Sequence, residues 1–377
     1  MFVDFSVIQT VPSSNINRDD TGSPKTALYG GVRRARVSSQ AWKRAMRREF
    51  EGLLPDGSLG VRTKLAAELI AERIKTERPD LERQAGDLGS AALRALGIKV
   101  EKSTRAGSDE GKMQTGYLIF ISNAELAKLA AIAIKWADSG IDLKKIGKDQ
   151  KKEASAAFHG VKAVEIALFG RMLADVPELN TDASAQVAHA ISVDKVTQEY
   201  DYFTAIDDCA SDDNAGAAML DTVSFNSSTL YRYATVNVDS LYDQLGDMEA
   251  TASAVSAFAE AFIRSMPTGK QNTFANRTLP NTVLVSLRDE QPVNAVSAFE
   301  SPVRPQAGDS ISHQASIRLA KQVKAIEESY DMPARKAWSI VSGVSVAELE
   351  EISLPVDLKT MLSQLHDEVL SGLSTEA

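Results

Sequence analysis

The sequence contains a single cysteine, Cys209, among its 377 residues. One cysteine excludes an internal disulfide and any metal site built from a cysteine cluster. The four histidines, His159, His189, His313 and His366, lie far apart in the sequence, so a histidine-based zinc site is not expected. No Ser/His/Asp or Cys/His arrangement is apparent from local sequence. We therefore expect no metal and no cofactor.

Long hydrophobic runs are also lacking. The most apolar stretch, 126–136, contains Lys128 and Lys135 and is too short to cross a bilayer. The opening segment MFVDFSVIQT is interrupted by Asp4 and has no basic region before it, which is not typical of a secretory signal. These features predict a cytoplasmic protein with no membrane partner.

The basic residues are concentrated in residues 18–48, which we call the basic window. It contains nine Lys or Arg side chains and two acids, a formal balance of +7, whereas the whole chain carries −9. The remainder therefore sums to −16. A local basic surface on an acidic protein is typical of a groove that follows a phosphate backbone. A protein that bound nucleic acid by diffuse charge would be basic throughout.

The end of the window predicts an amphipathic helix over 40–50, capped by Ser38 or Ser39. At helical spacing, one arc is basic (Lys43, Arg44, Arg47 and Arg48) and the opposite arc is apolar (Trp42, Ala45, Met46 and Phe50). The N-terminus of such a helix favours a phosphate, here beside Ser38, Ser39 and Gln40.

The alternative interpretation of the basic arc is an ordinary solvated helix face. Two features of the lead-in favour phosphate contact instead. Gly30 and Gly31 permit the backbone to approach a ligand closely, and three further arginines follow at 33, 34 and 36.

The rest of the chain predicts an α+β domain with a large helical insertion. Strands are expected at 2–11, 229–238 and 282–288, an exposed hairpin within 192–224, and helices near 255–266, 314–328 and 356–370. The block 61–180 is expected to be almost wholly helical, with a capping box at Ser122 and Glu125 and a helical run at 153–174. His189 is expected on an apolar helix. A split β-α-β arrangement fits, and it is a common RNA-binding scaffold.

Three smaller features keep two interpretations each. The turn at 267–273 does not match a phosphate-binding loop, which leaves Lys270 and Gln271 either as backbone contacts or in a simple turn after a helix. Met172, Phe203 and Leu220 are either core residues or apolar wedges that insert between bases. The acid pairs at 19–20 and 207–208 are either metal ligands or simply solvated or paired with neighbouring arginines, and a third metal ligand is missing from both.

Five segments together resemble the CasC family, which forms the crRNA-binding backbone of the type I-E CRISPR Cascade complex. They are NRDDTGSPKTALYGGVRRARVSSQAWKRAMR, ALFGRMLAD, QVAHAIS, DYFTAIDD and SSTLYRYATVNV, in the family's order. The resemblance implies a modified RNA-recognition (ferredoxin-like) palm at 1–60, 181–192 and 225–377, the last with C-terminal helices. It also implies inserted helical fingers at 61–180 and a protruding β-hairpin thumb at 193–224.

The resemblance also implies roles for individual residues. RNA phosphates and sugars would be contacted by Lys25, Ser38, Gln40, Lys43 and Arg47, with Arg18 and Arg44 as second candidates and Ser39 beside them. Met172, Phe203 and Leu220 would pack against the base displaced where the RNA kinks. Lys270 and Gln271 are weaker candidates because the family varies there. The acidic segment DDCASDD departs from what RNA contact requires, so it is expected beyond the groove or against a neighbouring subunit.

Members of the family polymerise along the guide RNA, kink it at intervals, and leave the intervening segments to pair with target DNA. The partners expected are therefore crRNA, target DNA through the crRNA, other copies of the chain and the other Cascade subunits. We expect a non-catalytic subunit. The rival hypothesis is a metal-dependent RNA endonuclease subunit that uses Asp19, Asp20 or Asp207.

Overall fold

The computed structural model describes residues 1–103, 110–159, 163–205 and 219–376, which form two compact units. The first unit comprises Met1–Glu49, Gln186–Asp239 and Val255–Ala377, and the second comprises Phe50–Ala185 and Ser240–Ala254. A large sheet with helices confirms the predicted α+β class. The boundaries of the palm, fingers and thumb remain predictions.

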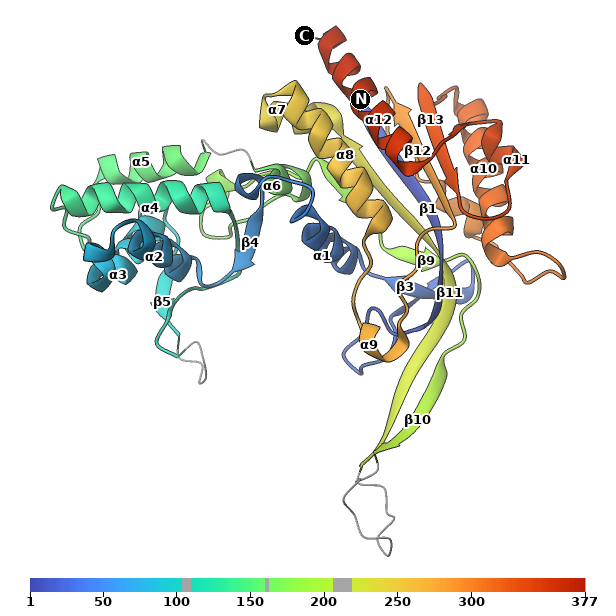
Figure 1. Ribbon diagram of the computed structural model, residues 1–377, viewed down its shortest axis with the longest axis horizontal. Helices are drawn as coiled ribbons and strands as arrows, with labels where there is room; N and C mark the ends of the chain where they lie inside the picture. Colours follow the sequence, from blue (N-terminus) through green and yellow to red (C-terminus); the bar gives the residue numbers. More distant parts are fainter. Residues whose placement is uncertain (104–109, 160–162, 206–218, 377) are drawn as a thin grey trace, which may run out of the picture. The chain divides into compact units, whose positions relative to one another are not determined.

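The first unit is built on one twisted sheet (Figure 1). Its strand order is β14 (Leu354–Pro355), β13 (Lys336–Val341), β12 (Thr282–Arg288), β1 (Phe2–Ser14), β11 (Met219–Asn237), β9 (Ala190–Ser192), β3 (Val32–Val37) and β2 (Thr26–Tyr29); β8 (Ala185–Val187) also pairs with β11. Central β1 pairs antiparallel with both β11 and β12. Its alternating side chains face two hydrophobic layers, which is why almost the whole strand is buried.

Helices cover both faces of this sheet. Phe5 of β1 packs against Phe258 and Phe262 of α8 (Met248–Arg264). On the opposite face, Ile8 belongs to a core with Leu319 of α10 (Ile311–Tyr330). The remaining helices of the unit are α1 (Ser39–Phe50), α9 (Gln271–Phe274), α11 (Ala347–Glu350) and α12 (Leu358–Glu376). The first unit therefore has one helix layer on each side of the sheet.

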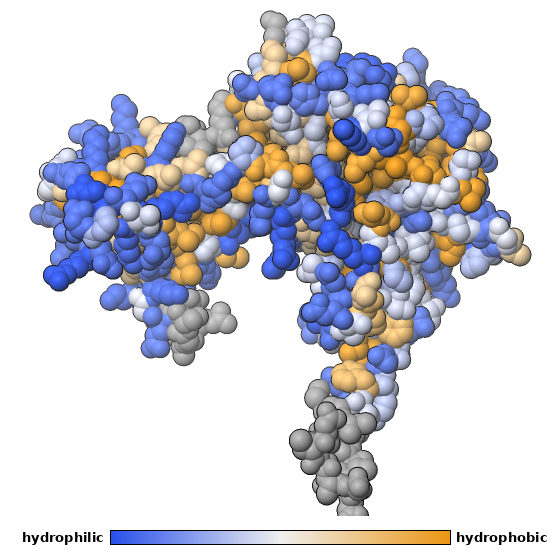
Figure 2. Space-filling view, in the orientation of Figure 1, coloured by the Kyte–Doolittle hydropathy of each residue, from blue (hydrophilic) through white to orange (hydrophobic). Residues whose placement is uncertain are grey.

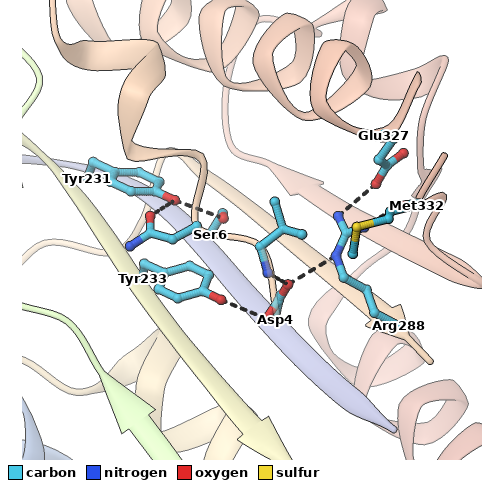
Figure 3. A network of polar contacts seen from close by, with 9 residues as sticks. Asp4, Ser6, Tyr231, Tyr233, Arg288, Glu327 and Met332 are labelled. Atoms are coloured by element: carbon cyan, nitrogen blue, oxygen red, sulfur yellow. Dashed lines mark hydrogen bonds and ion pairs between the residues drawn. The ribbon is translucent and has the colours of Figure 1, made fainter. Parts of the chain in front are cut away.

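A buried polar network joins the strands to α10 (Figure 3). The Asp4 carboxylate accepts hydrogen bonds from the Tyr233 hydroxyl at 2.8 Å, the Arg288 Nε at 3.0 Å and the Val293 N–H at 2.8 Å. Arg288 also pairs with Glu327 of α10 at 2.7 Å. Burial raises the pKa of Asp4 despite these partners. Because all four elements contribute, the network fixes β1, β11, β12 and α10 together.

A long hairpin extends from the sheet (Figure 1). β10 (Glu199–Ala205) pairs antiparallel with the first seven residues of β11, from Phe225 back to Met219. The rest of β11 continues along β1 to Asn237. The structure thus has a hairpin at the predicted place, and its pairing extends one residue beyond the predicted range, to Phe225. The acidic segment at 207–213 lies outside the described residues.

The second unit is helical with two small sheets. Its helices are α2 (Ala66–Glu77), α3 (Ala85–Ala95), α4 (Asn123–Asp138), α5 (Lys148–His159) and α6 (Val164–Phe169); α7 (Val238–Leu245) lies mostly in it. The sheets are β4 (Gly60–Thr63) with β7 (Ile119–Ser122), and β5 (Val100–Lys102) with β6 (Met113–Thr115). These strands correct the expectation of an almost wholly helical block at 61–180.

Other predictions have mixed outcomes. The capping box at Ser122 and Glu125 is confirmed at the start of α4. The strand at 282–288 and the closing helices are also confirmed. The single helical run at 153–174 is wrong, because α6 ends at Phe169, before Gly170 with φ 75°. The helix predicted around His189 is wrong too, because this residue lies between β8 and β9. Within the described residues, no helix is long and apolar enough to cross a bilayer.

Candidate nucleic-acid interface

Helix α1 has the two faces that its sequence predicts. Trp42, Met46 and Phe50 are fully buried, and Ala45 is nearly so. On the opposite arc, Arg44 and Arg48 are exposed and Lys43 and Arg47 are half-buried. Figure 2 shows strongly hydrophilic side chains over this part of the first unit. The helix therefore presents four cations on one side while its aromatic side holds it to the core.

The N-terminus of α1 is fixed by Asn17. The Ser38 N–H donates to Asn17 Oδ1 at 2.8 Å, and the Lys25 N–H donates to the Asn17 carbonyl at 2.9 Å. Ser38 is buried, Ser39 is half-buried, and Gln40 is exposed. The first-turn N–H groups of a helix have no intrahelical acceptor and favour an anion. One asparagine thus holds Lys25 beside the N-terminus of α1.

The loop that carries Arg18 is a compact turn. Asp19 Oδ1 accepts from the Thr21 N–H at 2.9 Å, the Thr21 hydroxyl at 2.7 Å and the Ser23 N–H at 3.0 Å. The Thr21 hydroxyl is the main reason that the pKa of Asp19 is lowered. Arg18 is exposed at the base of this turn, where its backbone forms an antiparallel β-bridge with Pro24. The Oδ1 atom of Asp19 therefore holds residues 19–23 in this turn.

The turn with Lys270 and Gln271 packs against the start of the same loop. Lys270 has φ 50° and precedes α9. A Cβ on Gly269 would lie 2.4 Å from the Ile16 carbonyl oxygen, so only glycine permits this approach. At the other end of α9, the Phe274 ring lies 5.6 Å from the Phe225 ring at the base of the hairpin.

Asn15 completes this assembly, because its Nδ2 donates to the carbonyls of both Gly22 and Ser224, each at 2.9 Å. The structure therefore brings together four parts of the first unit: the loop 15–25, the start of α1, the turn at 269–271 and the hairpin base. Figure 1 shows α9 beside the base of the hairpin. We call this assembly the basic surface.

The hairpin carries aromatic side chains on both faces. Phe203 is 37% exposed and lies opposite Asp221. Leu220 pairs with Thr204 through the backbone, and its side chain lies outside the described part of the structure. Tyr200 and Tyr202 occupy the other face and are 68% and 64% exposed. The sequence interpretation passed over these two tyrosines, although strand alternation separates them from Phe203.

Met172 lies in the second unit and is 80% exposed, so the core interpretation of this residue is wrong. Its backbone follows the left-handed Gly170, where α6 ends. The structure describes Met172 within its own unit only. Its relation to the basic surface remains a prediction.

Two parts of the basic window contact the protein itself and are not available to a ligand. Arg34 is fully buried and donates to the carbonyls of Tyr29, Ser192, Val193, Phe299 and Glu300. A Cβ on Gly30 would lie 1.7 Å from the Glu300 carbonyl oxygen, so its close approach is to the protein itself. The window therefore presents fewer charges than its sequence indicates.

Arg36 and His189 form a pair next to the basic surface. Arg36 donates from Nη1 to His189 Nδ1 at 3.1 Å and from Nε to the Thr26 carbonyl at 3.2 Å. Burial, followed by the charges of Arg36 and Lys25, lowers the pKa of His189. An arginine only donates, so this bond requires an unprotonated Nδ1.

A second basic region, around the start of α5, was not recognised as a site from the sequence. Five exposed lysines lie in and before the first turns of α5: Lys144, Lys145, Lys148, Lys151 and Lys152. The last three share a helix face by their spacing. Such a cluster attracts phosphate without specific geometry.

Acidic clusters are less informative. Among the residues that the structure describes, no group of three or more His, Cys, Asp or Glu side chains is arranged to hold a metal ion. Asp207 and Asp208 lie outside those residues.

Comparison with known proteins identifies similar proteins over almost the whole chain. The family model described as "CT1975-like protein" matches residues 3–368. A chain of a solved "CRISPR RNA-guided surveillance complex, pre-nicking" is 31% identical, with a TM-score of 0.81, covering 97% of this chain and 100% of that chain. A chain of a solved "CRISPR RNA-guided surveillance complex" is 29% identical, with a TM-score of 0.72 and the same coverage. No curated protein matches the sequence.

Proposed function

The chain belongs to the CT1975-like family, and from this we propose that it is the crRNA-binding backbone subunit of a type I-E Cascade surveillance complex. The similar solved chains come from CRISPR RNA-guided surveillance complexes, which supports a role as a component of such an assembly. We propose that the protein acts in the cytoplasm. Its partners would be crRNA, further copies of itself and the other Cascade subunits.

The observation that carries the proposal is the basic surface of the first unit. Lys25, the start of α1 and the turn at Lys270 are held together by Asn15, Asn17 and the close contact of Gly269 with Ile16. Helix N–H groups and cations on a rigid frame suit an RNA backbone, whatever its base sequence. The RNA-binding set would be Arg18, Lys25, Ser38, Ser39, Gln40, Lys43, Arg44, Arg47, Lys270 and Gln271.

Apolar side chains would act on the bases. We propose that Met172, Phe203 and Leu220 pack against a displaced base wherever the guide kinks, because apolar wedges unstack neighbouring bases. The segments between kinks would then pair with target DNA, and base pairing would supply sequence recognition. A single subunit with a few phosphate contacts binds weakly, whereas many copies on one RNA bind by multivalency.

We propose that the subunit is non-catalytic. The rival endonuclease would need Asp19 or Asp20 free to act on RNA. Asp19 Oδ1 instead accepts three hydrogen bonds within its own turn, which supports a structural role. The Asp20 carboxylate lies in the same turn, and Asp207 is outside the described residues.

The test is co-expression of the chain with a CRISPR array and the partner subunits, followed by size-exclusion chromatography with absorbance at 260 and 280 nm. We expect a large particle that contains RNA of one discrete length. An RNA-free monomer in the presence of all partners would contradict the proposal. Magnesium-dependent cleavage of RNA by the purified chain, abolished by Asp20→Ala, would support the endonuclease instead.

A further inference from the structure

Met172 is unusually exposed for its position in the chain. It is 80% exposed, while its neighbours Arg171 and Leu173 are buried, at 8% and 0%. The Met172 side chain is therefore directed away from the core while both of its neighbours are packed into it. The backbone contacts around it show how it is held.

The segment before Met172 is fixed by a glycine and a short antiparallel bridge. Gly170 has φ 75°, and a Cβ there would lie 3.0 Å from the Thr181 carbonyl oxygen. Arg171 and Thr181 then exchange two backbone hydrogen bonds, of 2.8 and 2.9 Å. On the far side of Met172, the Leu173 N–H donates to Asn180 Oδ1 at 2.6 Å. The backbone is therefore held both before and after the exposed methionine.

The Arg171 side chain extends this support into the core of the second unit. Its Nη1 donates to Glu125 Oε1 at 2.6 Å, and its Nε donates to the Leu179 carbonyl at 3.2 Å. The guanidinium carbon lies 4.2 Å from the centre of the Phe158 ring. Both members of the ion pair are buried, with side chains 5% and 1% exposed.

Glu125 is in turn fixed by the capping box of α4. Its Oε2 accepts from the Ser122 N–H at 2.8 Å and from the Ser122 hydroxyl at 3.0 Å. One carboxylate thus caps a helix with one oxygen and pairs with Arg171 through the other. The ion pair therefore anchors the backbone next to Met172 to the capped N-terminus of α4, a helix of sixteen residues.

We propose that Glu125 and Arg171 are positioning residues, which hold Met172 as a fixed apolar wedge against the guide RNA. This inference rests on the proposed function. A wedge whose backbone is already fixed before binding has only its side-chain rotamers left to order when it separates two bases. Without the buried pair, the methionine would still be present and exposed, but its direction would no longer be set.

The test compares variants assembled with the guide RNA and partner subunits, with base exposure read by dimethyl sulfate modification. Met172→Ala defines which guide positions depend on the wedge. Glu125→Gln keeps an oxygen for the cap but removes the charge that faces Arg171. Asn180→Ala loosens the same segment without altering a buried charge. We expect both variants to change modification at the Met172-dependent positions by at least half of the Met172→Ala effect.

The double variant Glu125→Gln/Met172→Ala separates positioning from a general loss of structure. If Glu125 acts through Met172, the modification pattern of the double variant will equal that of Met172→Ala. Asp4→Asn is the matched control, because Asp4 and Arg288 form a buried pair in the first unit, with both side chains 4% exposed. It should lower the melting temperature and leave the modification pattern unchanged.

Three outcomes are decisive. Wild-type patterns in Glu125→Gln and Asn180→Ala, beside a changed pattern in Met172→Ala, would overturn the positioning role alone. Additive effects in the double variant would do the same. A wild-type pattern in Met172→Ala itself would overturn the wedge within the proposed function and this inference with it.

Discussion

The guanidinium carbon of Arg232 lies 3.8 Å from the centre of the Trp42 ring, and 4.6 Å from that of Phe262 on α8. Arg232 is fully buried in β11, and its Nη1 donates to Gln9 Oε1 at 2.6 Å. Its Nη2 donates to the Phe262 carbonyl. Burial lowers the pKa of Arg232 to about 9. A buried cation in contact with two aromatic rings thus joins the sheet to α1, the helix with the basic arc.

This arrangement predicts that lysine is a worse replacement for Arg232 than methionine. The lysine ammonium is strongly hydrated in the unfolded chain and loses that hydration when it is buried. It also has no flat surface to stack on the two rings, whereas methionine keeps the apolar contact. We expect Arg232→Lys to lower the free energy of unfolding by roughly 2–4 kcal/mol and Arg232→Met by less. Urea denaturation measures both, and greater stability of the lysine variant would contradict this account.

The basic arc of α1 predicts a loss of affinity that does not depend on base sequence. Lys43→Ala/Arg47→Ala should weaken binding to single-stranded RNAs of different sequence by similar factors. It should also reduce the slope of log K against log salt by about 1.4, since each phosphate contact on a single strand contributes about 0.7. Filter binding at several salt concentrations measures both effects.

The matched control for this pair is Lys324→Ala/Arg335→Ala, which removes two exposed cations of the first unit that lie outside the basic surface. It should leave the salt slope unchanged. A strong dependence of the Lys43/Arg47 effect on RNA sequence would argue for base recognition instead.

The hairpin is expected to be dispensable for folding and required for assembly. Tyr200 and Ser224 face each other across the strands. A two-residue Asn-Gly turn in place of 201–223 can therefore close the hairpin there, and it keeps the Asn15 bond to Ser224. We expect a melting temperature within a few degrees of the wild type and no large RNA-containing particle. Normal assembly of the shortened chain would refute a thumb role.

His189 predicts a pH dependence of stability. Its pKa is lowered in the folded protein, by burial first and then by Arg36 and Lys25. The unfolded chain takes up this proton near pH 6.5, before the folded chain does, so wild-type stability falls as the pH drops through that value. His189→Gln lacks this titration. The stability of the wild type relative to this variant should therefore decrease from pH 7.5 to 5.5 in thermal unfolding, and a constant difference would rule the titration out.

The lysine cluster at 144–152 predicts a non-specific contribution to nucleic-acid binding. Replacing all five lysines with alanine should weaken binding of the assembled complex to duplex DNA of unrelated sequence, with a shallower salt dependence. Five Lys→Arg changes keep the charge and should preserve binding. An alanine variant with wild-type affinity would show that these lysines are only a solvated face.

The sequence interpretation succeeded where local periodicity decides structure. The two faces of α1 and the buried strand β12 follow from side chains within one turn or one strand. It failed where distant segments decide. Arg34 sits in a run of arginines that reads as surface, yet the carbonyls that bury it come from residues 192–193 and 299–300. β13 was missed, because pairing with β12 rather than its own pattern makes it a strand.

Local sequence left the exposure of Met172 open between a core residue and an apolar wedge, because its neighbours Arg171 and Leu173 are both buried. By contrast, the Ser122–Glu125 capping box was recognised, although nothing in the sequence indicated that the second oxygen of Glu125 holds Arg171.

The nineteen residues of β11 have a mechanical consequence. The same strand runs through both the sheet and the hairpin, so the hairpin is an arm whose fixed end is the β1–β11 ladder. A sideways load on the arm cannot be relieved by a flexible joint, because rotation there would break backbone bonds on both sides of β11. The ladder is weakest where its register shifts, between the Val11–Ser228 pair and the Ser14–Asn226 pair. The arm should therefore bend elastically about that irregularity, and its stiffness should be set by the sheet.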